Sequence, residues 1–311
     1  MANHLIIGLG GTGGRVLKAM RERVFQEFHT NNPDKGTYVN YLYVDSDDEA
    51  LGKSKRWQVM GNRVGLEDTQ TANTHGTVTL QTLQEIHRNE VLNAIITEDE
   101  VKRTLEDGDV RDIIVKGIGG QRRRFGRLLI ANSLQTKAQD GFLPRIKAAA
   151  KNLQTKGNNE TDVTFHICAG LAGGTGSGSI IDVVSQIRTI YTPTEKTPYK
   201  IYLYLYIPEN GEPTWDGEKG YYHANGYAAL RELNALSVGK LEPVDISGAK
   251  DPQTGLIRRL KFSTDVFNAA FLYSNSNGKR TAGEELNNIV ADFIYQITSV
   301  HYKLFHCVAI H

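Results

Sequence analysis

Two glycine-rich segments are the parts of this sequence best suited to bind an anion. The first is Gly8-Leu9-Gly10-Gly11-Thr12-Gly13-Gly14, which fits the pattern G-x-G-x-x-G, and the second is Gly173-Gly174-Thr175-Gly176-Ser177-Gly178. Each segment follows an apolar run typical of a strand and precedes a helical pattern. Backbone N–H groups at the start of a helix attract anions, and glycine lets a phosphate approach them closely. Together the two segments predict a nucleotide-phosphate site.

The elements that must position these segments alternate between strands and helices. Short apolar or β-branched runs predict strands at 5–8, 38–44, 110–115, 162–169, 199–207 and 266–273, and apolar periodicity predicts helices at 15–28, 127–138, 143–153, 180–191, 224–236 and 283–300. Such alternation predicts an α/β fold with a Rossmann-like parallel sheet and helices on both faces. The polar stretch 52–110 is predicted to be an insertion with small elements of its own.

Composition excludes several classes of protein. Apolar residues make up 40% of the chain and charged residues 23%, an ordinary globular balance, and the formal net charge of +1 argues against a dedicated nucleic-acid or polybasic membrane protein. The sequence contains no run of 18 apolar residues, so it offers no candidate for a membrane-spanning helix. Cys168 and Cys307 are too few for a disulfide framework or a zinc site. With no leader pattern at the N-terminus, we expect a cytoplasmic protein.

Two familiar phosphate-binding patterns fit less well. Gly52-Lys53-Ser54 matches the end of a P-loop, but Asp47 stands where its first glycine belongs. A Rossmann-type dinucleotide site explains the first glycine segment, and Asp45 then follows the second strand as a ribose-binding acid should. The spacing from Gly13 to Asp45 is longer than the usual ~20 residues, however, and the second segment stays unexplained. An NAD-type oxidoreductase remains an alternative.

The second segment, preceded by Ala172, resembles the signature loop G-G-G-T-G-[ST]-G of the tubulin/FtsZ superfamily, with Ala172 in place of the first glycine. Further segments resemble the superfamily's other loops in the same order along the chain. They are 10–14 (first phosphate loop), 44–51 (second loop), 117–120 (third loop), 207–210 (sugar-contacting loop), 272–275 (a strand end carrying asparagine) and 285–290 (the start of the central helix). The resemblance covers about residues 5–299.

The resemblance implies a role for each of these residues, and no catalytic residue is among them. The phosphates would contact Gly10, Gly11, Thr12, Gly13, Gly173, Gly174, Thr175, Gly176, Ser177 and Gly178, with Gly119 and Gly120 facing the γ-phosphate. The ribose would contact Glu209 or Asn225, guanine would contact Asn275 and Asn287, and Asp45 or Asp47 would organise Mg²⁺. Turn formation explains Asn275 equally well, a solvated helix position is the alternative for Asn287, and helix capping is the alternative for Asp47.

The function implied by the resemblance is that of a GTP- and GDP-binding, FtsZ-like cytoskeletal protein that forms filaments by head-to-tail self-association. In the superfamily, a neighbouring subunit supplies an acidic loop for hydrolysis. No such loop follows Val300, so we expect either a fragment of a longer protein, which we favour, or a GTPase domain without its activating half. In both cases we expect this chain alone to be a weak or inactive GTPase. We expect a GTP-binding domain at 1–282, the central helix and a tail at 283–311, and no second, activating domain. A non-hydrolysing GTP- or GDP-binding interaction module is an alternative. Accessory proteins are not indicated.

Overall fold

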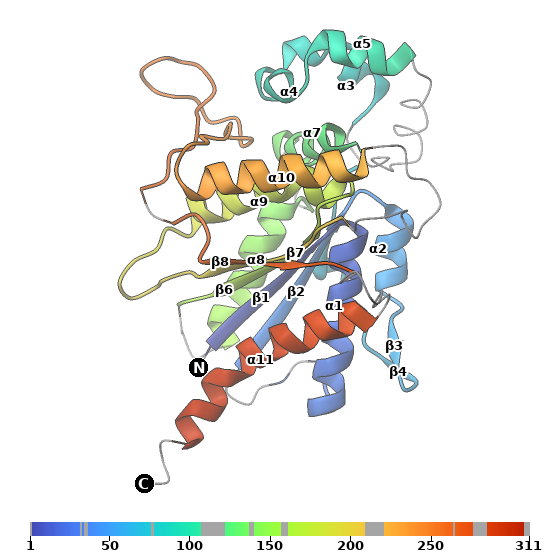
Figure 1. Ribbon diagram of the computed structural model, residues 1–311, viewed down its shortest axis with the longest axis vertical. Helices are drawn as coiled ribbons and strands as arrows, with labels where there is room; N and C mark the ends of the chain where they lie inside the picture. The colour runs from blue at the N-terminus through green and yellow to red at the C-terminus, as the bar shows by residue number, and fades with distance from the viewer. Residues whose placement is uncertain are drawn as a thin grey trace.

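A parallel β-sheet forms the centre of the computed structural model, which describes residues 2–31, 33, 37–75, 78–106, 122–136, 140–156, 161–208, 221–263, 265–275 and 285–307. The sheet has six strands in the order β5-β2-β1-β6-β7-β8, and every pairing is parallel (Figure 1). The strands are β1 (Ala2–Leu9), β2 (Thr37–Asp45), β5 (Thr71–Asn73), β6 (Thr164–Gly170), β7 (Ile201–Tyr206) and β8 (Ala269–Tyr273). The predicted α/β fold with a parallel sheet is therefore confirmed.

Each central strand buries side chains on both faces of the sheet. In β1, Leu5, Ile7 and Leu9 belong to one apolar core, while Ile6 belongs to the other. Successive side chains of a strand point to opposite faces, so a run of apolar residues marks a strand that is covered on both sides. This is why the central strands appear in the sequence as nearly continuous apolar runs.

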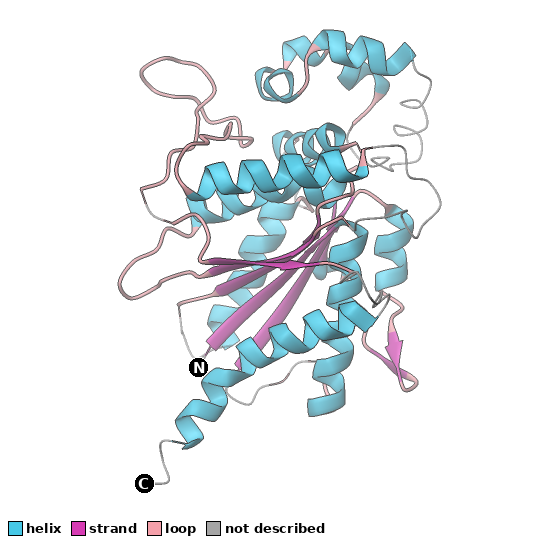
Figure 2. Ribbon diagram, in the orientation of Figure 1, coloured by secondary structure: helices cyan, strands magenta, loops and turns pink. Residues whose placement is uncertain are grey.

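Helices cover both faces of the sheet (Figure 2). The core of one face includes residues of α7 (Arg123–Gln135), α8 (Phe142–Lys156), α9 (Thr175–Ile190) and α10 (Tyr222–Ser237), and the core of the other includes residues of α1 (Gly10–Phe28), α2 (Asp48–Ser54) and α11 (Glu285–Cys307). Arg23 joins α1 to α11, because its Nε lies 3.1 Å from the Asp292 carboxylate and its guanidinium lies 4.6 Å from the centre of the Tyr295 ring. None of the helices described here is long and apolar enough to cross a membrane.

The predicted insertion at 52–110 is only partly separate from the sheet. It contains the hairpin β3 (Gln58–Val59) and β4 (Asn62–Arg63), the short helices η1 (Asp68–Gln70) and η2 (Ile86–Arg88), and the helices α3 (Leu80–Gln84), α4 (Glu90–Ile95) and α5 (Glu98–Glu106). The helices α3 to α5 stand beyond α7 (Figure 1). Its strand β5, however, pairs with Tyr43–Asp45 and forms the edge of the main sheet.

The two helices at the glycine segments begin earlier than the sequence predicts. Helix α1 starts at Gly10 instead of residue 15, and α9 starts at Thr175 instead of residue 180. Much of each glycine segment is therefore the first turn of a helix and not a loop. Helix α1 follows β1 without a connection and α9 follows β6 after four residues, and glycine permits the close packing of both helix starts against the sheet. The predicted strand at 110–115 lies outside the described residues.

Candidate functional site

The carboxyl ends of five strands meet at one edge of the sheet. Val44, Leu9, Ala169, Leu205 and Leu272 are register partners across β2, β1, β6, β7 and β8, and each lies within one residue of its strand's end. The chain order reverses between β1 and β6, because β2 lies on one side of this pair and β7 on the other. In open α/β sheets, ligands bind outside the carboxyl ends of the strands at such a point. Both glycine segments start there.

The two glycine segments touch each other. Gly10 has a φ of 67°, and a Cβ added to it would lie 3.2 Å from the Gly176 nitrogen. A Cβ on Gly176 would lie 2.8 Å from the Gly170 oxygen and 3.1 Å from the Leu9 oxygen. The neighbour of Gly10 is backbone of α9, and the neighbours of Gly176 are backbone atoms of the sheet. The close approach of α1, α9 and the strand ends therefore itself requires glycine at both positions.

Packing does not explain two other glycines of these segments. A Cβ on Gly173 would meet no atom within 4 Å, and a Cβ on Gly11 would meet only the Arg15 Nη1, at 4.0 Å. Neither residue has a positive φ among the described backbone angles. Any small side chain would fit these positions in the protein alone. Their lack of a side chain leaves backbone uncovered on the outside of the site, which is what the close approach of a ligand requires.

The starts of α1 and α9 carry no side-chain cap. The residues preceding them, Leu9 and Gly174, have no side-chain hydrogen-bond acceptor, and neither first turn contains an acidic residue. Helix α2 is different, because Asp47 caps it and Asp48 and Glu49 follow. The first N–H groups of a helix have no partner within the helix, and its dipole places partial positive charge there. Two such uncapped ends side by side form a surface whose partial positive charge favours an anion.

Hydroxyl groups and one arginine border this surface. The Ser46 hydroxyl lies 3.2 Å from the Thr175 hydroxyl and so connects the end of β2 to the second glycine segment. The Arg15 Nη2 donates a hydrogen bond to Thr12 Oγ1 at 3.2 Å. Arg15 is absent from the residues predicted above. Residues four apart in a helix lie on the same face, so the sequence would have placed Arg15 beside Gly11 only if α1 had been predicted to start at Gly10.

The two acidic residues predicted to organise magnesium both have partners in the protein. The Asp45 carboxylate is buried and accepts hydrogen bonds from the Tyr43 hydroxyl at 2.7 Å and the Ser46 nitrogen at 2.8 Å. Burial raises the pKa of Asp45. Asp47 Oδ1 accepts from the first turn of α2. Among the described residues no cluster of three potential metal ligands occurs. A metal held directly by Asp45 and Asp47 does not fit this arrangement.

The residues predicted to contact the nucleoside lie around the same edge of the sheet. Asn287, at the start of α11, accepts a hydrogen bond from the Tyr206 hydroxyl at 3.1 Å, which places it at the end of β7. Asn275 follows the end of β8. Asn225 is buried, and its Nδ2 donates to the Ala172 oxygen at 2.9 Å, so that it holds the second glycine segment against α10. The predicted residues Gly119, Gly120 and Glu209 lie outside the described residues.

Ion pairs fix helix α7 beside the second glycine segment. Arg127 makes a two-pronged bond to the buried Asp182 of α9, with N–O distances of 2.7 and 3.0 Å, and Asp182 raises the pKa of Arg127. Arg123 pairs with Glu232 of α10 at 2.8 Å, and Arg124 pairs with Glu100 of α5. These arginines are therefore committed to carboxylates of the protein.

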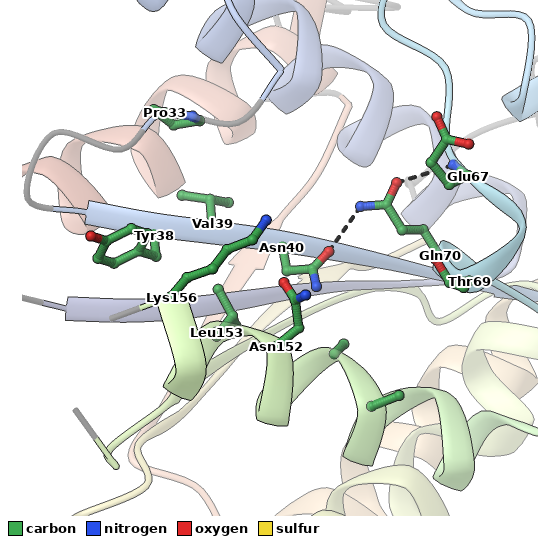
Figure 3. Close-up of a pocket in the computed structure, with 12 residues that line it drawn as sticks. Pro33, Tyr38, Val39, Asn40, Glu67, Thr69, Gln70, Asn152, Leu153 and Lys156 are labelled. Carbon is green, nitrogen blue, oxygen red and sulfur yellow. Dashed lines mark hydrogen bonds between the residues drawn. The ribbon is translucent and has the colours of Figure 1, made fainter. Parts of the chain in front are cut away.

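A cavity of about 640 Å³ lies away from this edge, where the N-terminal half of β2 faces η1 and α8 (Figure 3). Asn40 and Gln70 line it and are joined by a hydrogen bond of 2.8 Å, and Lys156 reaches toward Asn40 from the end of α8. Because β2 runs from Thr37 to Asp45, this cavity is at the opposite end of the strand from Ser46 and the glycine segments. It is separate from the surface formed by the two uncapped helix ends.

Comparison with solved structures gives distant likenesses. CetZ from Methanosaeta thermophila strain DSM 6194 is 14% identical, with a TM-score of 0.45, and the match covers 96% of this chain and 55% of that one. CetZ2 from Haloferax volcanii, in a GTPγS-bound protofilament, is 14% identical, with a TM-score of 0.48 and coverage of 96% and 58%. TubZ of Clostridium botulinum phage c-st is 11% identical, with a TM-score of 0.45 and coverage of 96% and 60%. The chain thus spans less than two thirds of the length of these proteins.

Comparison with protein families is more informative than comparison with single proteins. No curated protein matches the chain. The model of the family described as "Tubulin like" matches residues 5–303. This match includes both glycine segments and helix α11 up to Lys303, and it agrees with the resemblance seen in the sequence. Because the match extends over nearly the whole chain, the protein belongs to this tubulin-like family.

Proposed function

We propose that the chain binds a guanine nucleotide, GTP or GDP, with its phosphates at the starts of α1 and α9. The observation that carries this proposal is the meeting of two uncapped helix ends at the point where the strand order reverses. The open positions at Gly11 and Gly173 support it, because protein packing gives no reason for glycine there. Phosphate charge would be met by backbone N–H groups and helix dipoles.

The nucleoside would extend from the phosphates toward the ends of β7 and β8. Asn287 and Asn275 are proposed to contact guanine, since an amide offers both a donor and an acceptor to a purine edge. The Tyr206 hydroxyl supports this role for Asn287 by holding its side-chain oxygen. Glu209 or Asn225 is proposed to contact the ribose. Mg²⁺ is proposed to accompany the nucleotide through its phosphates and water, because Asp45 and Asp47 are engaged by the protein.

The full-length protein is proposed to self-associate head to tail in the cytoplasm. An interface between two different surfaces of one protein propagates into a filament when the rotation between subunits does not close a ring. Hydrolysis would then require a neighbouring subunit, and this chain alone would turn over GTP weakly or not at all. A non-hydrolysing module that keeps the nucleotide as a structural ligand is the alternative. Turnover that rises more steeply than protein concentration would favour the filament GTPase.

The first experiment identifies the nucleotide. We would denature the purified protein, identify any released nucleotide by chromatography, and titrate GTP, ATP and NADH into the stripped protein. The proposal expects GTP and GDP to bind with micromolar or tighter affinity. Binding of NADH without GTP would instead indicate a dinucleotide enzyme. Against that alternative, the carboxylate that would have to bind the ribose, Asp45, is buried and already bonded to Tyr43 and Ser46.

A glycine variant tests the location of the phosphates. A Cβ on Gly173 would meet no protein atom within 4 Å, so we expect the fold to tolerate Gly173→Val while the added side chain obstructs the nucleotide. Gly52→Val is the matched control, because a Cβ on Gly52 also meets nothing within 4 Å, but it lies on α2 beyond the glycine segments. Equal nucleotide affinity of the two variants, with both folded, would refute the proposed phosphate position.

A further inference from the structure

Arg15 is a positively charged side chain at the glycine segments, and among the residues the structure describes no carboxylate lies within 4 Å of it as an ion-pair partner. It is exposed on α1, and its guanidinium donates to the Thr12 hydroxyl at 3.2 Å. It also lies close enough to the hydroxyls of Tyr43 and Tyr206 to act on them electrostatically. By contrast, Arg123 and Arg127 nearby are bound to carboxylates.

The geometry of the helix directs Arg15 toward the site. Side chains of a helix lean toward its N-terminus, so the Arg15 side chain covers the turn that contains Gly11, four residues earlier. Gly11 has no side chain to fill that turn, and the Arg15 Nη1 lies 4.0 Å from the point where a Cβ of Gly11 would be. The guanidinium therefore lies over the uncovered backbone at the start of α1.

Arg15 faces the nucleoside side of the proposed site. Tyr206, whose hydroxyl is within reach of the Arg15 charge, ends β7 and bonds Asn287 of α11, which is proposed to contact the base. The hydrogen-bond partner of Arg15, Thr12, belongs to the first glycine segment and packs against the end of β6, because a Cβ on Gly170 would come 2.6 Å from the Thr12 Oγ1. A group placed between Thr12 and Tyr206 would meet the phosphates nearest to the ribose.

We propose that Arg15 binds the diphosphate that GDP and GTP share, and that it supplies the side-chain charge that the lysine-free glycine segments lack. This inference rests on the proposed nucleotide site. A guanidinium offers several N–H donors in one plane and bonds phosphate oxygens in pairs, which makes such contacts about twice as strong as neutral hydrogen bonds. The Thr12 hydroxyl accepts from Arg15, so its own proton remains available to donate to a phosphate oxygen.

The test compares two variants that each remove one positive charge from the same face of α1. Arg15→Gln removes the proposed contact, and Lys18→Gln removes a charge that pairs with Glu22 at 3.6 Å. Stripped protein is titrated with GDP and GTP, and guanosine affinity is measured by displacement of labelled GDP. We expect Arg15→Gln to weaken GDP and GTP equally, by about 10- to 100-fold, while guanosine binding is unchanged. Lys18→Gln should change affinity less than about 2-fold.

Two further measurements separate a phosphate contact from other roles. Arg15→Gln should make the affinity for GDP less dependent on salt concentration, because one ionic contact is lost. Arg15→Lys keeps the charge but not the planar pair of donors, so it should recover only part of the affinity. Equal affinities of Arg15→Gln and Lys18→Gln would overturn the inference, and so would an equal loss for guanosine and GDP.

The experiment also separates this inference from the proposed function. If the wild-type protein binds ATP or NADH and not GTP, the guanine proposal fails, but the same comparison of variants with that nucleotide still decides the role of Arg15. If the wild-type protein binds none of these nucleotides, both proposals fail.

Discussion

The same substitution, glycine to alanine, should have opposite effects on stability at Gly176 and at Gly11. At Gly176 the added Cβ would lie 2.8 Å from the Gly170 oxygen and 3.1 Å from the Leu9 oxygen, both of which belong to the sheet. Relief requires the first turn of α9 to move away from β1 and β6. Adding a carbon to a well-packed site costs about 1–3 kcal/mol. Gly176→Ala should therefore lower the free energy of unfolding by about that amount.

At Gly11 the added methyl group would meet only the Arg15 Nη1, at 4.0 Å. The residue lies within α1 and is exposed. Alanine is favoured over glycine in a helix by about 0.8–1.0 kcal/mol, so Gly11→Ala should raise the free energy of unfolding by up to that amount. The two variants should thus differ by about 2–4 kcal/mol, the sum of the two estimates.

Urea unfolding of the nucleotide-free variants, extrapolated linearly to water, measures this difference. A second measurement on Gly11→Ala is the affinity for GDP, which should fall although the fold is more stable, since the methyl group covers backbone that the phosphates are proposed to approach. Wild-type stability of Gly176→Ala would show that the start of α9 does not approach β1 and β6 as closely as described. A stabilised Gly11→Ala with unchanged GDP affinity would show that the ligand does not contact the start of α1.

Two other predictions concern buried charge. Burial and the neighbouring His4 lower the pKa of His166, so the folded protein keeps this side chain neutral. An unfolded histidine takes up a proton below pH ~6.5, so the free energy of unfolding should fall as the pH drops below that value. Urea unfolding at pH 7.5 and 5.5 measures this fall, which should be smaller in His166→Gln. Asp182→Ala leaves Arg127 without its buried partner and should cost about 3–5 kcal/mol, whereas Glu49→Ala on the exposed start of α2 should cause no measurable change in the same assay.

The fold was predictable because its main signals are local. Continuous apolar runs such as 5–7 and 167–169 indicate strands that are buried on both faces, and the periodic segments between them indicate the covering helices. The helix starts were not predictable in the same way. Glycine disfavours helix, so propensity placed the beginning of α1 at residue 15, but packing against the sheet begins the helix at Gly10.

Strand β5 shows a second limit of local signals. Thr71–Asn73 has three residues, two of them polar, and is too short to display the alternation typical of a strand. Its conformation depends on parallel pairing with Tyr43–Asp45, which lie far away in the sequence. Only the folded chain brings these partners together, so the polar stretch 52–110 appeared to be entirely an insertion.

The candidate site shows the same limit at the level of single residues. In the sequence, Gly173 and Gly176 are equivalent members of one motif, yet Gly176 packs against Gly170 and Leu9 while Gly173 faces open space. Loss of nucleotide binding in a Gly176 variant would therefore report damage to the fold, whereas the same loss in a Gly173 variant would report a contact with the ligand. The motif identifies the region of the site, but the choice of a meaningful variant depends on which neighbours the fold supplies.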